Sequence, residues 1–190
     1  MSSRERLIQV TARLIREKGM AATGLAEILG LAELPKGSLY HYFPGGKEEL
    51  IKEALHSYKD WLAGGFKAKM KGSSCAAEGL SGIIDFFKDD LEASRYVAGC
   101  PIATVALESN EDLASIRTAV REVMDYWIQS LCAYLRYKGY NGNPSTAEDF
   151  IMQIEGALIM ARIYQSAAPL EKLKLKIKEI LQNDINREEA

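Results

Sequence analysis

Apolar residues recur at intervals of three and four along most of the chain, which is the spacing of one face of an α-helix. Residues 113–138 carry such a stripe from Ile116 to Leu135. No segment alternates apolar and polar residues as a strand does, and only five of the 190 residues are proline. The pattern predicts an all-α protein of about nine helices, over residues 3–18, 25–29, 38–42, 47–61, 76–94, 101–109, 113–138, 146–166 and 170–186.

The expected helices fall into two groups of different length. Three short helices separated by tight turns precede residue 47, and a longer helix follows Pro44-Gly45-Gly46. This layout is typical of a helix-turn-helix DNA-binding domain that leads into a helical body. We therefore expect a DNA-binding domain over residues 1–47 and a larger helical domain over residues 48–190, ending in a polar tail over 186–190.

The distribution of charge supports this division. A net charge of −2 argues against a nucleic-acid-binding protein, but residues 1–47 hold seven Lys or Arg and four Glu, a net charge of +3. The remainder holds 17 basic and 22 acidic residues, a net charge of −5. A basic head can attract phosphates locally on an acidic chain. There is no apolar run of about 18 residues and no apolar signal segment, so we expect a cytoplasmic protein without a membrane span.

The third short helix carries the candidate DNA-reading surface. On a helix over residues 36–43, Leu39 and Phe43 fall together and are expected to face the core. The opposite side is short, flat and rich in hydrogen-bond donors, which suits the major groove of DNA. Lys47, at the start of the next helix, combines a cation with backbone N–H groups and suits a phosphate. The alternative is that these aromatic residues are core, as is common at helix junctions. The outward side presents Lys36, Gly37, Ser38, Tyr40, His41 and Tyr42.

Residues 4–50 resemble the DNA-binding domain of TetR-family transcriptional repressors. The family pattern has an apolar first helix ending in Gly, then Thr, Ile, a turn, K-G-[ST]-L-Y-x-[HY]-F and K-E-E-L. An extra residue in P-G-G-K and the sequence Gly99 to Ile102 resemble the branch of lincomycin-resistance repressors, the LmrA/YxaF-like group. The matching residues are Leu7, Ile8, Leu14, Ile15, Gly19, Thr23, Ile28, Lys36 to Tyr40, Tyr42, Phe43 and Lys47 to Leu50.

The resemblance implies a repressor that binds a palindromic DNA operator, with contacts on and around the third helix. Thr23 is one expected contact and is also a candidate N-cap of the second helix. Glu33 stands where the family has a turn glycine, so either Glu33 adopts a strained backbone conformation or the turn is remodelled. The expected contacts are Thr23, Lys36, Gly37, Ser38, Tyr40, His41, Tyr42 and Lys47.

The resemblance also implies a homodimer, built from the last two helices of each subunit. Both helices carry apolar stripes, and Gly156 would allow a close approach. The alternative is that each stripe covers the core of its own subunit. The expected interface residues are Phe150, Ile154, Ala157, Leu158, Ala161, Leu173, Ile177 and Ile180.

The family further implies a small effector that binds in the body and releases the DNA. The suggested branch includes flavonoid-responsive repressors, and soft or aromatic side chains suit a flat aromatic molecule. Because few charged residues stand among them, we expect an uncharged or weakly charged effector. Each of these residues could instead be core. The candidate cavity residues are Phe86, Phe87, Tyr96, Met124, Trp127, Tyr134, Met152 and Met160.

Other classes of protein remain as alternatives, namely a helical interaction module or a metal-dependent enzyme. Glu53 and His56 have the spacing of a di-iron bundle ligand pair, but a second such pair is missing. No P-loop, nucleophile elbow or dinucleotide fingerprint occurs, so no catalytic residue, metal or cofactor is expected. Cys75, Cys100 and Cys132 form no metal or disulfide pattern and are expected to be buried, inert thiols.

Overall fold

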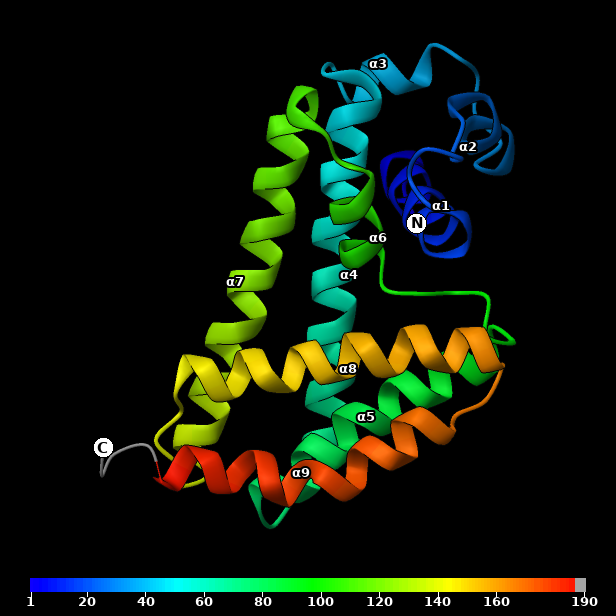
Figure 1. The fold of residues 1–190 in the computed structure, drawn as a ribbon. Coiled ribbons are helices and arrows are strands. Elements are labelled where there is room, and N and C mark those ends of the chain that lie inside the picture. The colour runs from blue at the N-terminus through cyan, green and yellow to red at the C-terminus, as the bar shows by residue number, and fades with distance from the viewer. Residues whose placement is uncertain (187–190) are drawn as a thin grey trace. The chain divides into compact units, whose positions relative to one another are not determined.

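Residues 1–186, which a computed structural model describes, form helices joined by turns (Figure 1). That range contains no strand, so the all-α fold is confirmed. The tail residues 187–190 lie outside the described part. The helices are α1 (Ser3–Lys18), α2 (Leu25–Leu31), α3 (Ser38–Tyr42), α4 (Gly46–Met70), α5 (Ala76–Ala93), α6 (Pro101–Glu108), α7 (Ala114–Tyr137), α8 (Pro144–Tyr164) and α9 (Ala168–Asn186), with a 3₁₀ turn, η1 (Glu111–Leu113), before α7.

Several helix boundaries differ from the sequence prediction by one or two residues, and the end of the fourth helix differs by more. The fourth helix continues to Met70 instead of ending near residue 61. The helices predicted to begin at residues 146 and 170 begin two residues earlier, α8 at Pro144 and α9 at Ala168, so that Pro144 and Pro169 both lie in a first helical turn. Proline is accommodated in the first turn of a helix because the N–H that it lacks has no intrahelical acceptor there.

The chain forms two compact units that are not continuous in sequence. Unit 1 contains residues 1–62 and 98–123, and unit 2 contains residues 63–97 and the chain from Met124 onward. Helices α4 and α7 each contribute residues to both units. This division differs from the boundary expected after residue 47, because Leu50 of α4 belongs to the same core as α1 to α3 and α1 also packs against α6.

The core of unit 1 explains how α3 is oriented. Leu7 of α1, Ile28 of α2 and Leu39 of α3 are fully buried in one cluster, together with Phe43 and Leu50. The predicted inward orientation of Leu39 and Phe43 is confirmed. Because these two residues are four positions apart, they anchor one side of α3 and leave the other side facing outward.

The turn between α2 and α3 keeps a regular hydrogen-bonding pattern despite Glu33. The Leu34 N–H donates to the Leu29 carbonyl at 3.0 Å, and the Glu33 N–H donates to the Gly30 carbonyl at 3.1 Å. This is a Schellman motif in which Glu33, at φ 55°, takes the left-handed position usually held by glycine. Of the two sequence-based alternatives, the strained residue is therefore the one observed.

Replacing this residue should relieve the strain. We expect Glu33→Gly to raise the free energy of unfolding by about 1 kcal/mol, since an L side chain in the left-handed region costs roughly that amount. Chemical denaturation of the purified protein measures the change. Glu49→Gly, inside α4, is the control and should destabilise, since glycine is a poor helix former. A Glu33→Gly protein no more stable than the parent would contradict this account of the turn.

Helix α6 holds the C-terminal end of α1 on two sides. The Glu108 carboxylate accepts hydrogen bonds from the backbone N–H groups of Met20 at 2.6 Å and Ala21 at 3.0 Å. At the other end of α6, the Gly99 N–H donates to the Arg16 carbonyl at 2.9 Å. Both contacts lie within unit 1. The turn between α1 and α2 is thus fixed by residues nearly 90 positions away in sequence.

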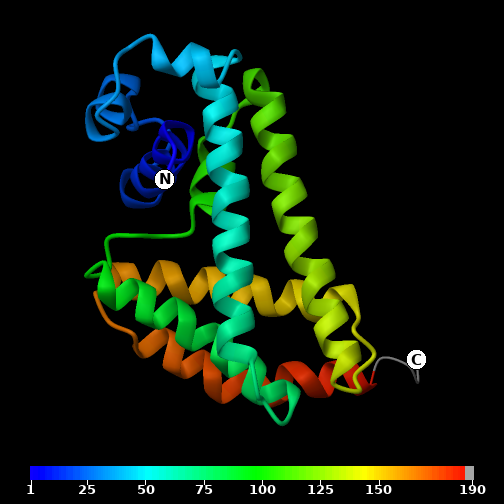
Figure 2. The ribbon, with the colours of Figure 1, turned by 180° about the vertical axis from the view of Figure 1, so that it is seen from behind.

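In unit 2, helices α5, α8 and α9 pack against one another. Both ribbon views show α8 and α9 side by side and running in opposite directions (Figures 1 and 2). The buried Asp184 of α9 accepts the N–H of Gly142 at 2.9 Å and that of Asn143 at 3.0 Å. The Asn141 side chain donates to the Asp184 carbonyl at 2.6 Å. These bonds tie the end of α9 to the turn between α7 and α8.

Candidate nucleic-acid interface and cavity

The outward side of α3 and the residues before it form an exposed polar surface. Lys36, Gly37 and His41 are exposed, and the Tyr40 side chain is 64% exposed. Ser38 is half-buried at the first position of the helix. The side chains of this surface can reach outward because Leu39 and Phe43 carry the packing of α3.

Two of the predicted DNA contacts are placed differently. Thr23 is fully buried, and its hydroxyl donates to the Gly19 carbonyl at 2.6 Å, so its side chain is not available to DNA. The N-cap of α2 is Gly24 and not Thr23. Tyr42 is half-buried, packs against the core of unit 1 and contacts the edge of the His41 ring, with ring centres 4.7 Å apart. Tyr42 is therefore only partly available to DNA, and its ring packs against that of His41.

Most of the positive charge near the N-terminus already has partners. Arg4 pairs with Glu53 at 2.8 Å, and Lys18 pairs with Glu27. Arg13 is 3.9 Å from Glu17, and the Arg16 guanidinium stacks on aromatic rings of α4. In contrast, no hydrogen bond or ion pair among the described residues involves the side chain of Lys36 or Lys47. The cations available for phosphates are therefore concentrated at the two ends of α3.

The start of α4 is partly occupied by its own side chains. The Glu49 carboxylate accepts the N–H of Gly45 at 2.7 Å, and the Gly46 N–H donates to the Phe43 carbonyl at 2.8 Å. The half-buried Lys47 is the second residue of α4. A phosphate at this position would therefore depend more on the Lys47 ammonium than on open backbone donors.

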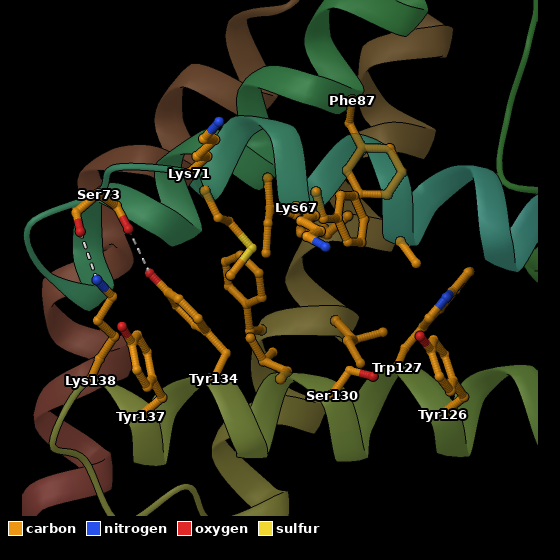
Figure 3. A pocket seen from close by; sticks show the side chains of 18 of the residues that line it. Lys67, Lys71, Ser73, Phe87, Tyr126, Trp127, Ser130, Tyr134, Tyr137 and Lys138 are labelled. Carbon is orange, nitrogen blue, oxygen red and sulfur yellow. Dashed lines mark hydrogen bonds between the residues drawn. The ribbon is translucent and has the colours of Figure 1, made fainter.

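Unit 2 contains a cavity of about 690 Å³, within the range of small-molecule sites. It lies between the C-terminal part of α4, the start of the turn after it, and helices α5, α7 and α8. In Figure 3, the side chains of Tyr126, Trp127, Ser130 and Tyr134 extend from α7 toward α4. The cavity has mainly aromatic walls, formed by Phe66, Phe87, Tyr126, Trp127, Tyr134 and Phe150.

Only some of the predicted cavity residues line it. Phe87, Trp127 and Tyr134 do, whereas the other five do not. Met152 and Met160 lie on the exposed outer side of α8 because they are offset around the helix from Phe150 and Ile154. Phe86 packs against Phe66 and Phe87, Tyr96 lies in the turn after α5, and Met124 is half-buried elsewhere on α7.

The charged residues of the cavity were missed by the sequence analysis. Lys67, Lys71, Lys138 and Glu155 all line it. They lie among polar residues at the ends of helices or on exposed faces, so no apolar or aromatic signal marks them. The assumption that few charged residues face the cavity is therefore corrected.

The predicted dimer residues are also placed differently. All eight are buried in the subunit, and Phe150 and Ile154 line the cavity. Their side chains serve the core of their own subunit, which corrects the sequence-based assignment. Instead, α8 exposes a different apolar face, which we call the outer α8 face. It consists of Met152, Ile159, Met160, Ile163 and Tyr164, each at least 42% exposed, beside the exposed Gly156.

The metal-enzyme alternative finds no support at His56. A smaller hollow in unit 1 brings His56 within 3.9 Å of Glu122, but Glu53 is paired with Arg4. Among the described residues, no group of three or more His, Cys, Asp or Glu is arranged to hold a metal.

Two of the three cysteines, Cys100 and Cys132, are buried as expected. Burial raises the pKa of the Cys132 thiol. Cys75, at the start of α5, is exposed, which corrects the expectation for that residue.

Comparison with known proteins gives matches along the chain. Residues 7–54 match the N-terminal domain of the TetR family of bacterial regulatory proteins, and residues 76–175 match the C-terminal domain of LmrA/YxaF-like transcriptional regulators. The chain is 30% identical to an uncharacterised helix-turn-helix regulator of Mycobacterium tuberculosis, covering 94% of this chain and 93% of that one. It is 26% identical to the regulator LmrA of Bacillus subtilis, covering 94% and 96%.

Solved structures of TetR regulators have the same fold as this chain. A TetR regulator from Chloroflexus aurantiacus superimposes with a TM-score of 0.78 at 26% identity, over 96% of both chains. The regulatory protein TetR from Rhodobacter sphaeroides gives 0.81 at 23% identity, over 94% of this chain and 98% of that one.

The fold, the outward surface of α3 and these matches define a DNA-binding transcriptional regulator of the helix-turn-helix class and not an enzyme. The chain belongs to the TetR family, and its C-terminal part is of the LmrA/YxaF-like type. None of its described helices is long and apolar enough to cross a membrane.

Proposed function

We propose that the chain is a ligand-responsive repressor, which binds a pseudo-palindromic operator as a homodimer and is released by a small, largely apolar aromatic effector. The observation that carries the proposal is the exposed polar side of α3 between the unpartnered Lys36 and Lys47. The aromatic cavity of unit 2 supports the ligand response.

On DNA, α3 would enter the major groove. Lys36 and His41 would read base edges, Lys47 would bind a phosphate, and Gly37 would allow a close approach of the backbone. A two-fold dimer would place two copies of α3 in successive major grooves, about 34–36 Å apart. The operator would then be an inverted repeat with matching half-site spacing.

The homodimer would form through the outer α8 face. Apolar side chains that are more than 40% exposed on one helix face are costly in a monomer, and burial against a second copy would remove them from water. A two-fold contact is isologous, so the same face of each subunit would be covered. Gly156 would let the two helices approach closely.

The effector would act through helices that belong to both units. Helix α4, which carries Lys47 in its first turn, also supplies the cavity residues Ala63, Phe66, Lys67 and Met70. Bound effector must favour a state that does not bind the operator, and such couplings are typically about 1–3 kcal/mol. That corresponds to a loss of operator affinity of roughly fivefold to 150-fold.

The test begins with selection of an operator from a pool of random DNA duplexes. Aromatic compounds, flavonoids first, are then screened for thermal stabilisation of the protein and for release of the selected operator. A Trp127→Ala protein, which lacks one cavity wall, should bind each hit more weakly. Selection that recovers no inverted repeat, or hits that bind Trp127→Ala equally well, would count against the proposal.

Substitutions at the two unpartnered lysines should separate phosphate binding from base reading. We expect Lys47→Ala to weaken binding to all sequences alike and to lower the salt slope of binding by about one per subunit. Lys36→Ala and His41→Ala should instead reduce the preference for the selected operator over scrambled DNA. Fluorescence anisotropy over a series of salt concentrations measures both effects, with Lys178→Ala of α9 as the control. If the salt slope of Lys47→Ala is unchanged, the proposal that Lys47 binds a phosphate is wrong.

A further inference from the structure

One end of the cavity concentrates hydrogen-bond donors around a lysine. The Lys138 ammonium donates to the Ser73 carbonyl at 2.6 Å and lies 5.9 Å from the ring centre of Tyr134 and 5.5 Å from that of Tyr137. Figure 3 shows these four residues together at one end of the cavity. An ammonium has three N–H groups, so two remain for a ligand.

The neighbouring hydroxyls are held in place beside this ammonium. The Tyr134 and Ser73 hydroxyls are 3.1 Å apart and share a hydrogen bond. Tyr134 also packs closely on Gly79, where a Cβ would lie only 1.8 Å from its hydroxyl oxygen. The position of Tyr134 therefore depends on a glycine, and the cavity end is a built arrangement of donors.

Positive charge exceeds negative charge around the cavity. Three lysines line it against one carboxylate, that of Glu155. In the described part of the chain, the side chains of Lys67 and Lys71 make no hydrogen bond or ion pair.

The acid that attracts Lys138, Glu78, is already engaged. Glu78 attracts Lys138 electrostatically, but its carboxylate accepts the Ser74 N–H at 2.6 Å and the Ser74 hydroxyl at 2.8 Å. These bonds lower the pKa of Glu78 and keep it paired with Ser74. Lys138 makes no ion pair among the described residues.

We propose that the cavity binds aromatic acids, in which a flat apolar ring system lies among the aromatic walls and a single carboxylate is bound by Lys138. This inference rests on the proposed ligand response and specifies its chemical class. It replaces the uncharged effector expected from the aromatic residues alone. A carboxylate would accept charge-assisted hydrogen bonds from the two remaining N–H groups of Lys138, beside the Tyr134 hydroxyl, which itself donates to the Cys75 carbonyl at 3.5 Å. A neutral amide of the same shape lacks the charge and places N–H groups where acceptors are required.

The test compares 2-naphthoate with 2-naphthamide, which share ring and size but differ in charge. Isothermal titration calorimetry of the full chain should show at least about tenfold tighter binding of naphthoate, with the preference falling as salt is raised. Lys138→Met, which keeps most of the apolar stem and removes the ammonium, should abolish the preference, and Lys138→Arg should retain it. Lys176→Met, an exposed lysine of α9 away from the cavity residues, is the control and should behave like the parent. Thermal unfolding of each variant checks that it is folded.

Each outcome decides the inference. Equal binding of the two probes, failure of naphthoate to bind, or a preference that survives in a folded Lys138→Met protein overturns it. Release of the selected operator is measured separately. If naphthoate binds with the expected preference but leaves the operator bound, the ligand class holds and the proposed ligand response fails. If neutral aromatic compounds alone release the operator, the ligand response holds and the aromatic-acid inference fails.

Discussion

The Ile163→Glu protein should sediment as a monomer and lose at least about a hundredfold in operator affinity. Ile163 is 64% exposed at the end of the outer α8 face, so glutamate is tolerated in the free subunit. In a dimer, the same carboxylate would be buried against apolar side chains, which is strongly unfavourable for an unpaired charge. Operator affinity falls because a monomer holds one half-site and loses the gain from two linked contacts.

A matched control separates this effect from a general one of added charge. Leu107 of α6 is 86% exposed, so Leu107→Glu introduces the same change at an apolar site outside the outer α8 face. It should leave both the sedimentation and the operator affinity unchanged. Sedimentation velocity and anisotropy on the selected operator measure the two properties. An Ile163→Glu protein that remains a dimer would place the interface elsewhere.

Ile154 is unsuitable for this test although the sequence suggested it. Its side chain is only 4% exposed and lines the cavity, so Ile154→Glu would place a charge in the subunit core. The expected result is an unfolded protein, which reports nothing about dimerisation.

Removing the Asp184 carboxylate should lower the free energy of unfolding by about 3 kcal/mol. Alanine at this position leaves the N–H groups of Gly142 and Asn143 without their acceptor, and a hydrogen bond to a charged group contributes roughly 1.5–3 kcal/mol. Asp184→Asn should cost less, because the amide oxygen still accepts one of the two bonds. Urea denaturation followed by circular dichroism measures both changes.

The exposed Asp112 of η1 provides the control for this prediction. Asp112→Ala removes a carboxylate of the same kind that makes no described hydrogen bond, and surface changes of this sort stay within about 0.5 kcal/mol. If Asp184→Ala is as mild as Asp112→Ala, the tie between α9 and the turn before α8 contributes little to stability.

Helix α8 shows how far sequence periodicity determines a fold and where it stops. The spacing of Phe150, Ile154 and Ala161 predicted a helix with an apolar stripe, and both are present. The helix carries apolar residues on two sides, however, and periodicity does not say which side meets the core. From the periodicity alone, the inner stripe was assigned to the dimer interface and two methionines of the outer side to the cavity. Only packing within the subunit separates these assignments.

The candidate sites show the same limit, since sequence spacing predicts which residues share a helix face but not which partners they meet in the folded chain. The outward side of α3 was predictable because Leu39 and Phe43 alternate with polar residues at helical spacing. Thr23 was misplaced because a threonine hydroxyl can bond forward as an N-cap or backward to a carbonyl, and only the structure chooses between them. Lys138 was missed because its role depends on its neighbours in the folded chain. Ser73 is distant in sequence, and Tyr134 is close in sequence but carries no charge that would mark a binding site.

The bonds from Glu108 to the turn after α1 limit how this regulator can be recombined with its relatives. A chimera that exchanges residues 1–47 for those of another family member transplants the turn but leaves its acceptor behind on α6. The incoming segment would also need a glycine at position 19, because the φ of Gly19 is 89° and a Cβ there would lie 2.2 Å from a Glu108 oxygen. In this chain, the N-terminal helices can therefore be exchanged only if the acid on α6 and the glycine that ends α1 are kept as a pair. In this chain the transferable module is discontinuous, consisting of the N-terminal helices together with α6.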